Sequence, residues 1–120
     1  MSTTQTAVQA TAFVVPLLSG KTETDRSAMR SCWHGDRKAA YESSRKRLGI
    51  TRESVWIQNT PGGDVAVVVL EAHDLQTALN GVGASQEPFD AWFREHARDV
   101  HGIELETGFP PPEQVLDFRS

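Results

Sequence analysis

The sequence predicts an α+β domain in which a four-stranded antiparallel sheet carries its helices on one face. β-Branched residues flank a Pro-Gly-Gly turn at 61–63, which is typical of a β-hairpin. Residues 88–101 repeat apolar side chains at spacings of three and four, as a helix with one buried face does. The predicted order of elements is strand, helix, strand, strand, helix pair, strand. This order corresponds to a βαββαβ arrangement with the helices on one side of the sheet.

The bulk composition indicates one globular domain. The chain has 120 residues, and we expect a loose tail at 1–7, an α+β core at 8–106 and a Pro-rich arm or strand at 107–120. The net charge of −4 disfavours binding to nucleic acid or to a membrane surface. Cys32 is the only cysteine, so a disulfide within the chain is excluded and a reducing, cytoplasmic location is expected.

The first half of the chain is expected to form one strand and one long, interrupted helix. The strand is predicted at 8–17 and the helix at 23–48, with a break where His34-Gly35-Asp36 combines a helix end with a new start. Thr22 is expected to cap the helix, and Asp25, three residues later, to complete a capping box.

The hairpin is predicted to join strands at 55–59 and 65–70 through a turn at 60–64. The second of these strands is apolar on both faces, so both faces of the sheet need to be covered. Helices on one face would leave the other face as an exposed apolar patch, which monomers seldom carry. We therefore expect a homodimer that packs sheet against sheet.

In the second half, Asp74 is expected to cap a short helix, and Pro88 to begin the longer helix that ends near Gly102. Three prolines at 110–112 predict a stiff spacer. The segment 115–118 beyond it is expected to form the last strand of the sheet or an arm.

The predicted arrangement is ferredoxin-like, and two stretches of the sequence resemble a known family. They are Arg47-Leu48-Gly49-Ile50-Thr51 leading into Val55-Trp56-Ile57-Gln58, and Pro88-Phe89-Asp90-Ala91-Trp92-Phe93 leading to Val100-His101-Gly102-Ile103. Both are similar to a bacterial family of unknown function with a dimeric α+β barrel fold, distantly similar to antibiotic biosynthesis monooxygenases. The resemblance implies a homodimer and specifies no reaction. In the dimer we expect a cavity either between the helices and the sheet or between the two sheets.

Candidate catalytic residues are His96 and Tyr41. His96 lies on the apolar stripe of the last helix, where it could act as a general base or bind a haem iron, although a hydrogen-bonded core histidine is the more common case. His101, five positions on, is expected to point elsewhere, and no second residue lies at metal-ligand spacing. We therefore expect no metal and no cofactor.

Candidate ligand-binding residues are Trp56, Gln58, Arg37 and Trp92, which could line one space together with Tyr41. A mixed surface at solvent or at a dimer contact explains Trp56 and Gln58 equally well. Three functions follow. The first is binding or transformation of a small, partly apolar molecule in the barrel cavity. The second is a non-catalytic dimerisation or interaction module, and the third is haem binding.

Overall fold

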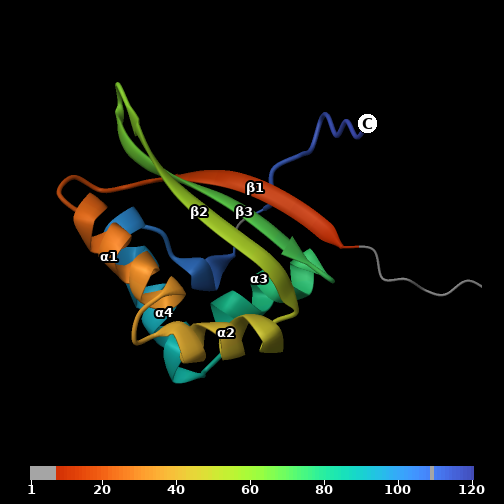
Figure 1. Ribbon diagram of the computed structural model, residues 1–120, viewed down its shortest axis with the longest axis horizontal. Coiled ribbons are helices and arrows are strands. Elements are labelled where there is room, and N and C mark those ends of the chain that lie inside the picture. Colours follow the sequence, from red (N-terminus) through yellow and green to blue (C-terminus); the bar gives the residue numbers. More distant parts are fainter. Residues whose placement is uncertain (1–7, 109) are drawn as a thin grey trace, which may run out of the picture.

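The computed structural model describes residues 8–108 and 110–120, which form an α+β domain (Figure 1). The order of elements is βααββαα. The elements are β1 (Gln9–Pro16), α1 (Thr22–Trp33), α2 (Lys38–Arg47), β2 (Ile50–Thr60), β3 (Gly63–Ala72), α3 (Leu75–Ala84), α4 (Pro88–His101) and a short 3₁₀ helix, η1 (Leu105–Thr107). The predicted loose tail at 1–7 lies outside the described residues.

The sheet has three antiparallel strands in the order β1-β3-β2, and the predicted hairpin is confirmed. β2 and β3 pair as far as Thr60 and Gly63, and the Thr60 hydroxyl donates to the Gly63 carbonyl at 2.6 Å to close the turn. β1 pairs with the other edge of β3, so the long apolar strand is the centre of the sheet.

The predicted fourth strand and the βαββαβ order are wrong. Residues 113–118 pair with no strand among the described residues, and Val115, Leu116 and Phe118 are exposed. The chain leaves the helical layer after η1 and ends beside the sheet, on the side away from the helices (Figure 1). Prolines donate no backbone hydrogen bond, so the run at 110–112 carries the chain away from a sheet edge instead of along it. Of the two alternatives expected for this segment, a strand or an arm, the structure shows an arm.

The predicted interruption of the first helix is confirmed, because α1 ends at Trp33 and α2 begins at Lys38. The predicted capping box is wrong. Lys21 occupies the cap position without a side-chain cap, and the Thr22 hydroxyl donates to Asp64 at 2.6 Å. Asp74 does cap α3 by accepting from the Thr77 amide, and Pro88 is the first residue of α4. No helix in the described part of the chain has the length and apolarity needed to cross a membrane.

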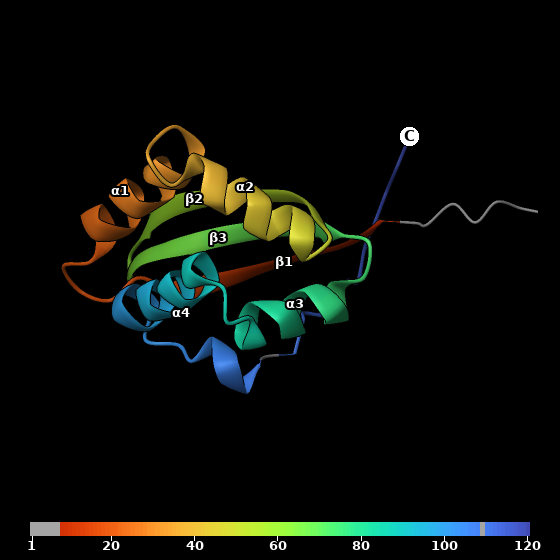
Figure 2. The same ribbon diagram turned by 90° about the horizontal axis from the view of Figure 1, so that it is seen from below.

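All four α-helices cover the same face of the sheet, as predicted (Figure 2). Strand alternation sends Phe13, Val15, Ala66, Val68 and Leu70 to that face. A small core lies where the sheet meets α3, formed by Ile50, Leu70, Ala72 and Ala78.

The opposite face of the sheet, which we call the open face, is largely apolar, and no element of the described residues covers it. Its central row is Val14, Val67 and Trp56, which lie side by side across the three strands. Val14 is 60% exposed and Trp56 53% exposed. The neighbouring rows are Pro16-Val65-Gln58, Ala12-Val69-Ser54 and Ala10-Glu71-Arg52.

A buried carboxylate ties α2 to the helices at 75–101. Asp90 on α4 accepts hydrogen bonds from Ser44 and Ser85, each at 2.5 Å, and from Arg47. Burial opposes the ionised form of Asp90, but the bonds from Ser44, Ser85 and Arg47 outweigh it and hold its pKa below the usual range. α2 and α4 are therefore fixed to one another, and each contributes residues to the space described next.

Candidate functional site

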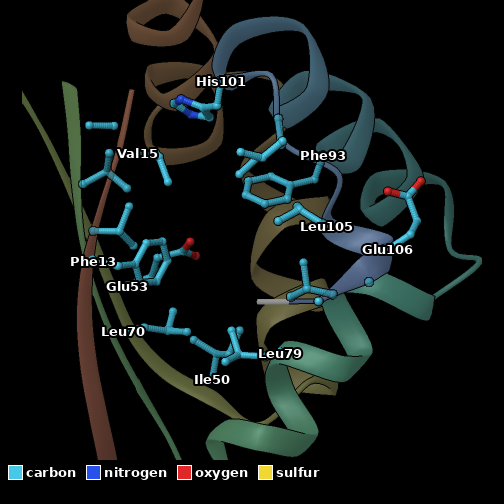
Figure 3. A pocket seen from close by; sticks show the side chains of 18 of the residues that line it. Phe13, Val15, Ile50, Glu53, Leu70, Leu79, Phe93, His101, Leu105 and Glu106 are labelled. Atoms are coloured by element: carbon cyan, nitrogen blue, oxygen red, sulfur yellow. The ribbon is translucent and has the colours of Figure 1, made fainter. Parts of the chain in front are cut away.

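A cavity of about 280 Å³ lies between the helical face of the sheet and the helices (Figure 3). The sheet supplies one wall, and α4 with α3 and η1 supplies the opposite one. Phe13 and Phe93 enter the space from these two walls, as Figure 3 shows. The other apolar lining residues are Val15, Met29, Ile50, Val55, Ala66, Val68, Leu70, Leu79, Val82, Ala84, Ala97, Ile103 and Leu105.

The lining follows from the periodicities of the elements. β1 contributes Phe13 and Val15, two residues apart, because alternate side chains of a strand share a face. α4 contributes Phe93, Ala97 and His101, each four residues from the next, because that spacing returns to the same helix face. Ala97 is the smallest of the three, and it leaves room between the larger side chains.

At one end of the cavity, α1 and α4 bring Asp25 and His96 together. The two side chains are 1% and 6% exposed, and Nε2 of His96 lies 2.8 Å from Oδ1 of Asp25. A carboxylate accepts, so the ring nitrogen donates. Asp25 lines the cavity, whereas His96 lines a shallow hollow on the outer surface, so this pair connects the two.

His101 completes the polar end of the cavity. Its Nδ1 lies 2.7 Å from the Pro16 carbonyl oxygen, which can only accept, so Nδ1 carries the proton. In the neutral ring Nε2 is therefore an acceptor, and it lies 3.9 Å from Oδ1 of Asp25. The prediction that His101 points elsewhere is wrong, since the His96 and His101 rings are 6.4 Å apart at their centroids.

Asp25 has spare hydrogen-bonding capacity. Its Oδ2 is buried and has no hydrogen-bond partner among the described residues. Buried polar atoms are nearly always paired, because an unpaired one loses its contacts with water without replacement. Chemically, this end of the cavity offers a carboxylate oxygen and an imidazole nitrogen that can accept a hydrogen bond or a proton from a bound molecule.

A second polar cluster lies on the cavity wall where α2 meets β2. Nε of Arg45 donates to Oε1 of Glu53 at 2.8 Å, and the Tyr41 hydroxyl donates to the same oxygen at 2.8 Å. Arg45 is buried, and its guanidinium lies over the Phe93 ring at 4.6 Å. Burial and the neighbouring Glu53 raise the pKa of Tyr41, so its hydroxyl stays protonated and continues to donate.

Three of the predicted site residues meet at the outer hollow, not in the cavity. His96, Trp92 and Arg37 line it together. The Trp92 ring stacks on His96 with centroids 5.4 Å apart, and the Arg37 guanidinium covers Trp92 at 4.0 Å. With Nε2 of His96 held by Asp25, that nitrogen is not presented to an iron. Catalysis by His96 and ligand binding by Arg37 and Trp92 stay predictions.

The other predicted residues are on different surfaces. Trp56 and Gln58 lie on the open face, across the sheet from the cavity, so any ligand role for them belongs to that face. Tyr41 sits behind the cavity wall, bonded to Glu53, so the structure does not bring it together with His96 or Trp56. Its catalytic role stays a prediction.

The polar residues that the sequence interpretation did not assign to a cavity include Asp25, His101, Arg45 and Glu53. Asp25 was assigned to a helix cap, and Arg45 lies among the cations of a last helical turn, which have a simpler explanation in the helix dipole. One signal was present for His101, since it follows Phe93 and Ala97 at intervals of four residues.

No group of three His, Cys, Asp or Glu side chains in the described ranges has the arrangement needed to hold a metal ion. No protein-family model, no curated protein and no solved structure matches the chain.

Proposed function

We propose that the protein binds a small, largely apolar molecule in the cavity between its sheet and helices. The observation that carries this proposal is a space lined mainly by aliphatic and aromatic side chains, with a few polar groups in its wall, among them Asp25, His101, Glu106 and the Arg45–Glu53 pair. Ligand pockets have this composition, since apolar walls supply affinity and a few polar groups fix orientation. A space needed only for packing would be filled, because protein interiors are close-packed.

The volume indicates the size of the occupant. An apolar cavity of about 150 Å³ is enough to bind benzene. The volume here, about 280 Å³, is nearly twice as large and corresponds to a bicyclic aromatic molecule or a branched chain of similar bulk.

Naphthalene tests this proposal directly. We expect saturable, one-to-one binding to the wild-type protein by isothermal titration calorimetry. Ala97→Leu should abolish or strongly weaken it, because Ala97 is buried and lines the cavity. Ala91→Leu is the matched control, on the exposed side of the same helix, and should bind as the wild type does. Absence of binding to the folded wild-type protein, or equal binding by both variants, would contradict the proposal.

A second candidate function, assembly of two copies through the open face, has its own supporting observation. An apolar row of Val14, Val67 and Trp56 lies at the centre of this face, with Val65 and Val69 beside it. Val14 and Trp56 are exposed, whereas Val67 is half-buried. Soluble monomers rarely expose such contiguous apolar surface. The Arg52 and Glu71 side chains at one end are 3.6 Å apart and present both signs of charge, which suits a second copy related by two-fold symmetry.

The arm at 110–120 would enlarge this interface. Three strands and four rows of side chains make a face of roughly 14 by 27 Å, or about 400 Å². A stable interface buries about 800 Å² per partner, so the open face alone supplies about half. The arm ends on the same side of the sheet and exposes Val115, Leu116 and Phe118 (Figure 1). Packing of these side chains on the partner would supply further area.

Native mass spectrometry at micromolar concentration tests the assembly, with a dimer expected for the wild type. Trp56→Glu should give monomers, because the charge would be buried between the sheets. Trp33→Glu is the matched control, since Trp33 is 70% exposed on α1 and lies outside the open face. A monomeric wild type would end this second proposal.

A further inference from the structure

We infer that the bound molecule carries a hydrogen-bond donor, a hydroxyl or a protonated amino group, that lies against Asp25 and His101. This inference rests on the proposed function, because it names the chemistry of the ligand that the cavity would hold. It comes from counting which polar groups around the cavity already have partners and which do not.

His101 contributes an acceptor. Its Nδ1 proton is directed to the Pro16 carbonyl at 2.7 Å, so Nε2 of the neutral ring has a lone pair and no proton. The nearest charged atom is Oδ1 of Asp25 at 3.9 Å, beyond hydrogen-bond distance. A donor placed near Nε2 would therefore make a bond that the protein alone does not make.

Asp25 contributes the second acceptor. Oδ1 receives the His96 bond, and Oδ2 is buried without a partner in the described part of the chain. Because the residue is only 1% exposed, water does not replace the missing contact. A ligand donor that reached Oδ2 would remove this energetic cost, so it would gain more here than at an exposed carboxylate.

The buried donors of the cavity wall are already engaged. Nε and Nη2 of Arg45 donate to Glu53, and its Nη1 donates to Ser44 at 3.0 Å. The Tyr41 hydroxyl also donates to Glu53. Gln76, Asn80 and Thr107 also line the cavity, but they are exposed to solvent. The remaining capacity of the buried groups is thus that of acceptors, which selects a ligand with a donor over one with only an acceptor.

Three probes of the same bicyclic size separate the possibilities. 2-Naphthol carries a hydroxyl, 2-naphthylmethylamine carries a protonated amino group, and 2-methylnaphthalene has the shape of 2-naphthol without a donor. In a purely apolar cavity the methyl compound would bind better than the naphthol, because a hydroxyl costs more to remove from water. We expect the reverse, with 2-naphthol or the amine binding at least about tenfold more tightly than 2-methylnaphthalene. The relative affinities of 2-naphthol and 2-naphthylmethylamine show whether the site prefers a hydroxyl or a protonated amino group.

Two variants locate the preference. Asp25→Asn keeps the shape and an oxygen for His96 but places an amide donor beside the cavity, so the preference for donor probes should disappear. His101→Asn keeps a donor for the Pro16 carbonyl and removes Nε2, so it should reduce the preference even where Asp25→Asn fails to fold. Asp99→Asn is the control, because Asp99 pairs with Lys21 at the surface, and it should leave all three affinities unchanged.

The outcomes distinguish this inference from the function on which it rests. Failure of every probe, naphthalene included, to bind the folded protein would overturn both. Binding of naphthalene with no advantage of either donor probe over 2-methylnaphthalene would overturn the donor inference alone. A donor advantage that survives in both Asp25→Asn and His101→Asn would also overturn it.

Discussion

Asp25, Arg45 and Asp90 are charged side chains folded into the interior of a chain of only 120 residues. Charged groups are seldom buried without partners, because leaving water costs several kcal/mol for each ion. Asp90 has three partners and Arg45 is paired with Glu53, whereas Asp25 has one partner for two oxygens. Asp90 and Arg45 stabilise the fold, whereas Asp25 can accept a further hydrogen bond from a ligand.

Asp90→Asn should lower the free energy of unfolding by about 2–3 kcal/mol at pH 7, because charge-assisted bonds are lost at a buried site. The pKa of Asp90 is lowered in the folded protein, so its stabilisation is complete above the ordinary carboxyl value near pH 4. It is lost as the pH falls below that value, through the folded pKa. Urea unfolding should therefore show the wild type and variant converging at low pH.

Asp36→Asn serves as the control for this prediction, because Asp36 is exposed between α1 and α2. Asp36→Asn should change the free energy of unfolding by no more than about 0.5 kcal/mol at any pH. A difference between wild type and Asp90→Asn that persists unchanged at pH 3 would contradict the assigned role.

Cys32 should react slowly with a thiol reagent in the folded protein. The side chain is buried, and burial raises the pKa of its thiol, so little thiolate forms near pH 8. Ellman's reagent should label it within seconds in guanidinium chloride and at a far lower rate in buffer. Fast labelling of the native protein would place Cys32 outside the core. The sequence already indicated this burial, since Cys32 falls among the apolar positions of its helix.

At the scale of elements, α3 and η1 depend on a glycine for close approach. A Cβ on Gly83 would lie 2.6 Å from the Leu105 carbonyl oxygen, and both residues line the cavity. Gly83→Ala should destabilise the protein by about 1–3 kcal/mol, although alanine gains about 1 kcal/mol in helix propensity. Thermal unfolding measures this change.

Gly81→Ala is the comparison within the same helix. Its Cβ would meet only the end of the Leu48 side chain, which can rotate away, so the change in stability should be small. Equal destabilisation by the two variants would show that helix packing, and not the Leu105 backbone, decides the cost.

The sequence was sufficient for most of the elements because their signals are local. The Pro-Gly-Gly turn, the Asp74 cap and Pro88 at the start of α4 each act within four residues. The capping box failed because Asp25 has a partner in the fold, His96, that is 71 residues away. The fourth strand failed for a related reason, since a strand requires a neighbour and no local pattern shows whether one is present.

At the scale of the whole molecule, the two faces of the sheet differ in what covers them. The two-sided apolarity of 65–70 predicted that both faces need covering, and the helices cover only one. The cavity lies under the covered face, while no described element covers the open face, and we propose that a second copy packs on it. A cavity was expected from the sequence, but its position and its lining residues could not be predicted, because they depend on how α3, α4 and η1 approach the sheet in three dimensions.

The central claim is that the cavity under the helices is a binding site, and a crystal structure of the protein grown with 2-naphthol tests it most directly. We expect the rings between Phe13 and Phe93 and the hydroxyl directed to Asp25 and His101. A cavity closed by side-chain movement, or 2-naphthol found only on the open face beside Trp56, would contradict the account.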